Sequence, residues 1–135
     1  AIGTFFALPS FSFFKSKINK IESDWLDFNF VNIEELIQED NIIFVDVTAE
    51  WCATCQFNKI NVLKNYLVKE AFLKYNVIKV RADWTKPNIK IEKFLKNNKK
   101  FGIPYNVIYD KNNVNGVELS ELLSVNEILE ILNNL

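Results

Sequence analysis

The chain of 135 residues contains no histidine and no methionine, and it has only two cysteines, three glycines and three prolines. The absence of histidine excludes a Ser-His-Asp triad, a Cys-His protease and a metal site that depends on imidazole. Two cysteines also fall short of the four ligands of a closed zinc site, so we expect neither a metal nor a cofactor. The scarcity of glycine and proline argues against fibrous structure and low-complexity linkers.

The charge balance gives no sign of a nucleic-acid partner. Lysine and arginine number 16 and acidic residues 17, so the net charge is −1 and the basic footprint of a nucleic-acid binder is missing. Apolar residues make up 49% of the chain, which is enough to bury a core. This length indicates one domain, which we expect to be monomeric, with a short appendage.

Both cysteines lie in the stretch Trp51-Cys52-Ala53-Thr54-Cys55, between an apolar run at residues 42–47 and a sequence of helical character. A strand that leads through Cys-x-x-Cys into a helix is typical of a dithiol/disulfide redox site. On the first turn of a helix the two sulfurs come within bonding distance, and the helix N-terminus favours the thiolate of the first. We therefore predict Cys52 as the exposed nucleophile and Cys55 as the less exposed resolving thiol. Gln56 after the second cysteine excludes a Cys-x-x-Cys-His haem site.

From residue 25 onward the hydrophobic pattern predicts the element order β-α-β-α-β-α-β-β-α. Nearly continuous β-branched and aromatic sequence at residues 42–48 is typical of a strand buried on both faces. Asn32 is a predicted helix N-cap, and residues 124–127 form a predicted capping box. The other strands are expected at residues 25–30, 77–83, 105–109 and 117–119, the last two joined by a turn at 110–116. Helices are expected at residues 33–37, 52–61, 62–75, 89–98 and 125–135, and the pattern leaves open whether 52–75 is one bent helix or two.

Asp46 lies six residues before Cys52, inside the run that is expected to be buried. A buried carboxylate is costly unless it has a partner or a function. From this position the side chain would reach under the helix towards Cys55 and take the proton of the resolving thiol. The alternative is a buried aspartate that local backbone groups satisfy.

Pro104 follows Gly102-Ile103 and begins the strand expected at residues 105–109. One interpretation is an ordinary trans proline at the first position of a strand. The other is a cis bond that exposes the backbone of Ile103 beside the dithiol, where a partner peptide would pair as an added strand.

Residues 44–55, together with Phe101-Gly102-Ile103-Pro104, resemble the thioredoxin superfamily. The resemblance implies an α/β thioredoxin fold over residues 25–135, with a central mixed β-sheet flanked by helices. It implies a cis Pro104 and a docking surface for disulfide partners at Trp51, Ile103 and Pro104. Glu50 would support this site, and Lys79 falls where thioredoxins carry a buried lysine near the aspartate.

A closer resemblance is to the C-terminal thioredoxin-like domains of membrane thiol:disulfide interchange reductases of the DsbD type. It depends on residues 48–55, on 80–85 and on 102–105 with the later 121–123, and residues 81–85 discriminate best. The resemblance implies a protein-disulfide reductase at the periplasmic face of the bacterial inner membrane. A membrane-embedded domain would reduce Cys52–Cys55, which would pass electrons to periplasmic disulfide proteins. Lys59 departs from the pattern, because relatives often carry an acid at this position. This departure leaves the reduction potential of the cysteine pair and the choice of partner open.

Residues 1–24 form an apolar segment, residues 1–14, followed by a basic tether. The apolar segment is too short to cross a hydrocarbon core of roughly 30 Å, so it is either an arm that packs on protein or the end of a transmembrane helix. The absence of methionine predicts that the chain begins as a processed or excised piece. Lysines at positions 15, 17 and 20 would favour the cytoplasmic side, against the periplasmic assignment.

Two alternatives to the reductase domain stay open. One is a free cytosolic thioredoxin, and the other is a thioredoxin-like binding module with a structural disulfide. Ala53-Thr54 lacks the histidine that strong oxidants carry between their cysteines, which favours a reductant. A disulfide within one helical turn closes too small a loop to stabilise a fold much, which disfavours the binding module.

Overall fold

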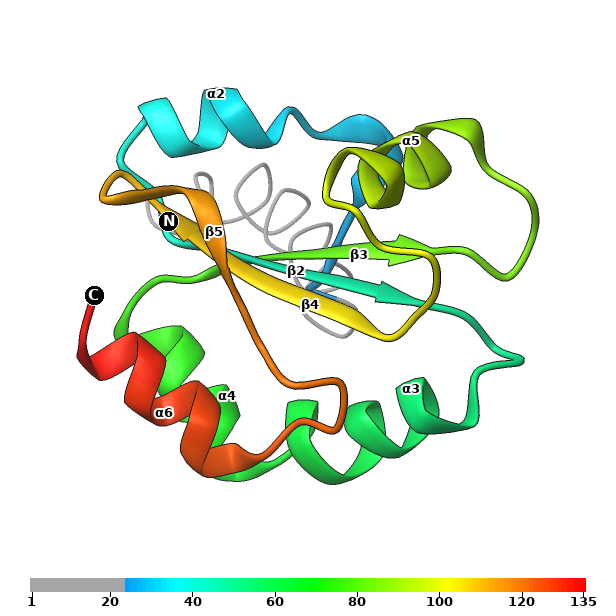
Figure 1. Ribbon diagram of the computed structural model, residues 1–135. Coiled ribbons are helices and arrows are strands. Elements are labelled where there is room, and N and C mark those ends of the chain that lie inside the picture. The colour runs from blue at the N-terminus through cyan, green and yellow to red at the C-terminus, as the bar shows by residue number, and fades with distance from the viewer. Residues whose placement is uncertain (1–23) are drawn as a thin grey trace, which may run out of the picture.

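The computed structural model describes residues 24–135, which form a five-stranded mixed sheet with helices on both faces (Figure 1). The strands are β1 (Leu26–Asp27), β2 (Ile43–Thr48), β3 (Ile78–Asp83), β4 (Tyr105–Asp110) and β5 (Asn113–Glu118). The helices are η1 (Phe28–Phe30), α2 (Ile33–Gln38), α3 (Ala53–Asn58), η2 (Lys59–Leu63), α4 (Tyr66–Lys74), α5 (Ile89–Asn97) and α6 (Val125–Asn133). The strand order is β1-β3-β2-β4-β5, in which β2 pairs parallel with β3 and antiparallel with β4. The predicted mixed sheet between helical layers is confirmed.

Strand β2 lies at the centre of the sheet, and all six of its residues are buried. Ile43, Val45 and Val47 pack in the core beneath α2 and α5. Phe44 points to the other face and packs with residues of η2, α4 and α6. This two-sided burial accounts for the continuous apolar run, because each face of the strand meets its own core. Alternate residues share a face, so Asp46 lies on the side of Phe44, which α3, α4 and α6 cover (Figure 1).

The prediction of a strand at residues 25–30 is wrong for residues 28–30. Only Leu26–Asp27 pair with β3, and Phe28–Phe30 form a 3₁₀ turn. The carboxylate of Asp27 accepts the backbone N–H of Asn29 at 2.9 Å, and this local bond competes with strand pairing. At the other edge, β5 begins earlier than predicted, because the hairpin turn after Asp110 takes only two residues.

Asparagine and serine caps set the helix boundaries. The side chain of Asn65 accepts the N–H of Leu67 and begins a new helix, so residues 52–75 form two helical segments, the first of which ends in the π-helix η2. Ser124 caps α6 as predicted, accepting the N–H of Glu127 at 3.1 Å. The second half of the predicted capping box is wrong, since the Glu127 carboxylate accepts the N–H and hydroxyl of Ser120 instead.

The apolar segment and tether predicted at residues 1–24 lie outside the described residues, apart from Asp24. Within residues 24–135 the structure has no helix with the length and apolar character required to cross a membrane.

Candidate active site

The two cysteines join in a disulfide at the point where the chain leaves β2 and enters α3. Cys52 is the N-cap residue, and its Sγ accepts the backbone N–H of Cys55 at 3.2 Å. A donor aimed at this sulfur would stabilise its thiolate after reduction. Cys52 is 8% exposed and Cys55 is 3% exposed. Cys52 is thus the more exposed residue of the pair, as predicted, although it is itself nearly buried.

Ile103 packs against the small cluster that Cys52 and Cys55 form with Ala49. The Ile103–Pro104 peptide bond is cis, as the resemblance implied. Pro104 itself is buried, whereas Ile103 is half-buried and the neighbouring Gly102 is exposed. The surface that a partner would meet beside the dithiol is therefore the segment at Gly102 and Ile103, with Pro104 beneath it.

Asp46 is 3% exposed and lies on β2 between Arg81 of β3 and Asn106 of β4. Burial raises the pKa of Asp46 from 3.8 to about 6, and the positive charges of Arg81 and Lys59 lower it in part. The Arg81 Nε lies 3.6 Å from the carboxylate Oδ2, which is an ion pair too long for a hydrogen bond. A carboxyl group with a pKa near 6 exchanges protons close to neutral pH, as a general acid or base must.

Lys79 is not the cation beside the aspartate, and this corrects the expectation that the resemblance raised. In the β2–β3 register Asp46 lies opposite Arg81, whereas Lys79 lies opposite Phe44 and pairs with Asp24. The guanidinium of Arg81 also stacks 4.1 Å above the ring of Trp25. Arg81 belongs to the most discriminating stretch of the sequence, but no pattern in the sequence assigned it a partner.

Two further polar residues share the buried face with Asp46. Thr48 is 2% exposed and Asn106 is 1% exposed. Neither the Thr48 hydroxyl, the Asn106 amide nor the Arg81 Nε has a hydrogen-bond partner in residues 24–135. Asn106 was missed from the sequence, although a polar residue inside a strand of otherwise apolar character was a signal.

Thr85 anchors the loop on the solvent side of the dithiol. Its hydroxyl accepts the backbone N–H of Glu50 at 2.9 Å, and its carbonyl accepts the indole N–H of Trp51 at 3.2 Å. Trp51 is 61% exposed and packs against Trp84, with ring centroids 6.0 Å apart. Glu50, predicted as a supporting residue, thus makes this contact through its backbone, and sequence reasoning missed Thr85.

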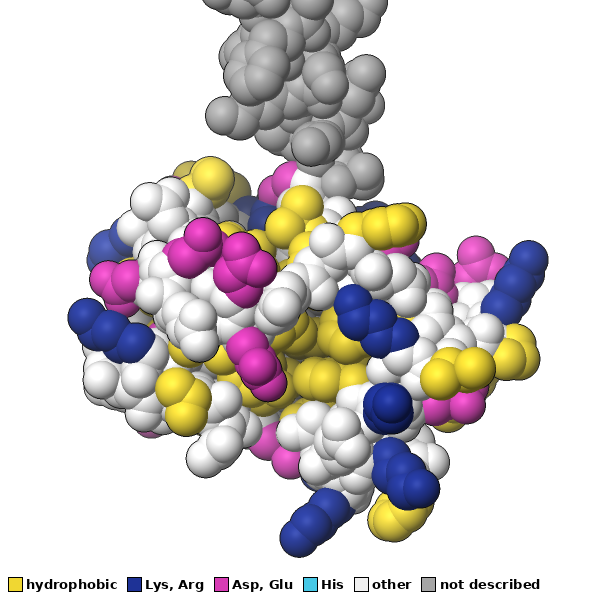
Figure 2. Space-filling model, turned by 90° about the horizontal axis from the view of Figure 1, so that it is seen from above, with side chains coloured by type: hydrophobic (Ala, Val, Ile, Leu, Met, Phe, Trp, Pro, Cys, Tyr) yellow, Lys and Arg dark blue, Asp and Glu magenta, His cyan; other side chains and the backbone are white. Residues whose placement is uncertain are grey.

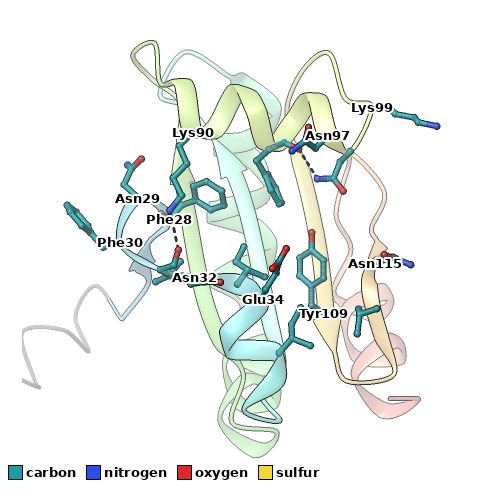
Figure 3. A pocket seen from close by; sticks show the side chains of 16 residues that line it. Phe28, Asn29, Phe30, Asn32, Glu34, Lys90, Asn97, Lys99, Tyr109 and Asn115 are labelled. Atoms are coloured by element: carbon teal, nitrogen blue, oxygen red, sulfur yellow. Dashed lines mark hydrogen bonds between the residues drawn. The ribbon is translucent and has the colours of Figure 1, made fainter.

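A broad groove of about 1320 Å³ lies on the other side of the sheet, between η1, α2, α5 and the β4–β5 hairpin (Figure 3). Figure 2 shows hydrophobic side chains in a hollow of this face, with acidic side chains on one flank and basic ones on the other. Lys90 of α5 lines the groove and donates to the carbonyls of Phe28 and Val31 at 2.8 and 3.1 Å. None of the predicted site residues lines this groove. Residues 24–135 also contain no group of three side chains among Asp, Glu, Cys and His that could hold a metal ion.

A family model described as thioredoxin-like matches residues 24–111. Among solved structures, the oxidised DsbD C-terminal domain of Neisseria meningitidis aligns with a TM-score of 0.62 at 18% identity, covering 76% of this chain and 88% of that one. Its reduced form gives 0.59 at 19% identity, with coverages of 76% and 89%. A thioredoxin from Thermus thermophilus gives 0.62 at 16% identity, with coverages of 82% and 84%. No curated protein matched this chain.

Proposed function

Because this chain belongs to the thioredoxin-like family, we propose that it is a protein-disulfide reductase that acts through Cys52 and Cys55. The observation that carries the proposal is the cysteine pair at the start of α3, above a buried Asp46 whose pKa is raised to about 6. A purely structural disulfide would require neither this carboxyl group nor a sulfur that accepts a backbone N–H.

The reaction is an exchange of two electrons between dithiol and disulfide. The Cys52 thiolate attacks one sulfur of the partner disulfide, forms a mixed disulfide and releases the other partner sulfur as a thiolate, which takes a proton. Cys55 then attacks the Cys52 sulfur and breaks the mixed disulfide. The partner leaves with two thiols, and the domain is left with the Cys52–Cys55 disulfide.

Asp46 serves the second step. It lies on the sheet face that α3 covers, and the charge of Lys59, one turn after Cys55, acts on its carboxylate. In its ionised form the carboxylate takes the Cys55 proton as that thiol becomes the attacking thiolate. Its pKa of about 6 leaves most of it ionised at neutral pH, yet close enough to protonation to return the proton in the reverse reaction.

The likeness to the DsbD C-terminal domain supports a proposal for the electron donor and the compartment. We propose that a membrane-embedded donor reduces Cys52–Cys55, and that disulfide proteins at the periplasmic face of the inner membrane are the acceptors. The 81–85 stretch supports this assignment through the sequence resemblance, and in the structure it contacts Asp46, Glu50 and Trp51. Residues 1–24 would serve as the membrane tether. Fractionation of source cells tests the placement, since a free cytosolic thioredoxin would separate with the cytosol.

Insulin reduction with dithiothreitol as the electron source tests the activity. We expect wild type to accelerate the reduction, Cys52→Ser to abolish the acceleration, and the potential to lie nearer about −270 mV than about −120 mV. A wild-type protein without any acceleration, or a potential below about −300 mV, would support a structural disulfide instead.

A further inference from the structure

The orientation of Trp51 depends on Thr85, because burial does not fix it. Trp51 is 61% exposed, so burial against other parts of residues 24–135 covers less than half of its surface. The Thr85 hydroxyl accepts the backbone N–H of Glu50, and the Thr85 backbone carbonyl accepts the indole N–H of Trp51. These contacts link the loop before Cys52 to the segment after β3, which is 34 and 35 residues away along the chain.

Asp83 and Trp84 hold Thr85 in turn. The Asp83 carboxylate accepts the backbone N–H of Thr85 at 3.0 Å and also its hydroxyl. The Thr85 hydroxyl therefore donates to Asp83 while it accepts from Glu50, which uses its single proton and one lone pair. Trp84 lies against Trp51 and donates its indole N–H to Glu92 at 3.2 Å. Its backbone N–H donates to the Thr48 carbonyl at 2.7 Å, so the segment is also tied to the end of β2.

We propose that Thr85 is a positioning residue for partner docking, because it holds the exposed indole of Trp51 ready to receive a protein that carries a disulfide. This inference rests on the proposed function and deepens it, because it assigns selectivity for protein disulfides over small ones. An aromatic side chain that is already ordered loses less conformational entropy on binding. A small disulfide reaches Cys52 without covering Trp51 and gains nothing from this ordering.

The test compares two oxidants in single-turnover reactions of the pre-reduced domain. One oxidant is insulin, and the other is the small disulfide 5,5′-dithiobis(2-nitrobenzoic acid). Thr85→Val keeps the shape of the side chain but removes the hydroxyl, and Thr85→Ser keeps the hydroxyl. Thr85→Val leaves the carbonyl that accepts the Trp51 indole, but it removes the hydroxyl that joins Glu50 to Asp83 and so loosens the backbone on which both groups sit. We expect this variant to slow insulin by about three- to tenfold, because Trp51 is then less ordered before binding. The small disulfide should react within about twofold of wild type, and Thr85→Ser should restore the insulin rate.

A double-mutant cycle shows whether Thr85 acts through Trp51. In a Trp51→Ala background, Thr85→Val should have no further effect on the insulin rate, because the side chain that it orders is gone. Near-ultraviolet circular dichroism of each variant reports on the pairing of the Trp51 and Trp84 rings. This spectrum should change in Thr85→Val and return in Thr85→Ser.

The proposal is overturned if Thr85→Val slows both oxidants equally, slows neither, or still slows insulin after Trp51 is removed. If Thr85→Val does not fold, failure of Thr85→Ser to match the wild-type preference for insulin overturns it as well. Failure of the proposed function would look different, since wild type itself would then not reduce insulin.

Discussion

The inner and outer sides of the dithiol differ in how their polar groups are hydrogen-bonded. On the inner side, beneath α3, Asp46 is buried beside Arg81 and Asn106 with no direct hydrogen bond to either. On the outer side, Glu50 and Trp51 are exposed, yet both donate to Thr85. The carboxyl group that must gain and lose a proton has a long ion pair with Arg81 instead of a hydrogen bond, whereas the surface that must meet another protein is held by hydrogen bonds. The difference separates proton handling from partner recognition within one active site.

The largest expected effect is the pH dependence that Asp46 gives to stability. Burial raises the pKa of Asp46 from 3.8 to about 6, so the folded protein favours the protonated form. Its contribution to stability is therefore present below the unfolded pKa and is lost as pH rises through about 6. This pKa difference corresponds to about 3 kcal/mol. The asparagine of Asp46→Asn does not titrate, so the free energy of unfolding of this variant minus that of wild type should rise by about 3 kcal/mol from about pH 3.5 to pH 7.5. Urea unfolding of the oxidised proteins measures this difference.

The matched control for this measurement is Val68→Ala, which shortens a buried apolar side chain in the core on the same side of the sheet. This substitution neither adds nor removes a titratable group, so its stability difference from wild type should stay nearly constant over that pH window. A constant difference for Asp46→Asn as well would show that the inner carboxyl group does not titrate where its burial places it.

The next effect is on catalysis by the same carboxyl group. Asp46→Asn should slow the attack of Cys55 on the mixed disulfide by about a hundredfold at neutral pH, because the amide accepts no proton. Attack by Cys52 on the partner should change far less. Rapid-quench alkylation separates the two steps, because mixed disulfide accumulates only when the second step is slow. Equal slowing of both steps would remove Asp46 from the role of base.

Two smaller effects, of opposite sign, are expected on the free energy of unfolding when a polar group is removed from the inner or the outer side of the dithiol. Asn106→Leu replaces an inner amide that has no hydrogen-bond partner in the described part of the chain, so it should raise the free energy of unfolding by about 1 kcal/mol. Thr85→Val removes an outer hydroxyl that both donates and accepts, so it should lower that free energy by about 1 kcal/mol. Urea unfolding measures the stability of both variants. Changes of the same sign in the free energy of unfolding would contradict the difference between the two sides.

The smallest effect concerns the two cations near Asp46. Arg81→Met and Lys59→Met should each raise the pKa of Asp46 further, and the Arg81 variant should raise it more, since its charge is the larger of the two influences. Carboxyl-carbon NMR titration of Asp46 in the oxidised protein reports this order. A lower pKa in either variant, or the reverse order, would contradict the electrostatic account.

Features that are local in the sequence were predictable, and those set by strand register were not. The Cys52–Cys55 pair, the buried Asp46 and the Ser124 cap lie on short stretches whose periodicity and spacing define them. Arg81, Asn106 and Thr85 join the site only through pairing of β2 with β3 and β4, or through contacts across more than thirty residues. A shift of two residues separates Arg81 from Lys79, and the sequence pattern on β3 does not distinguish between them.

The 3₁₀ turn at Phe28–Phe30 shows a second limit. Alternating apolar residues satisfied the pattern of a strand, but one hydrogen bond from Asn29 to the Asp27 carboxylate decided the backbone. Such competition between a local side-chain hydrogen bond and strand pairing depends on the identity of single residues, which periodicity does not encode.

The most direct test of the redox assignment is to trap the mixed disulfide. Cys55→Ser, reduced and then mixed with insulin, lacks the resolving thiol and should accumulate a covalent adduct. Peptide mapping by mass spectrometry should place the adduct on Cys52, and Cys52→Ser should form far less. Absence of an adduct in Cys55→Ser, or an equal yield from Cys52→Ser through Cys55, would contradict Cys52 as the nucleophile.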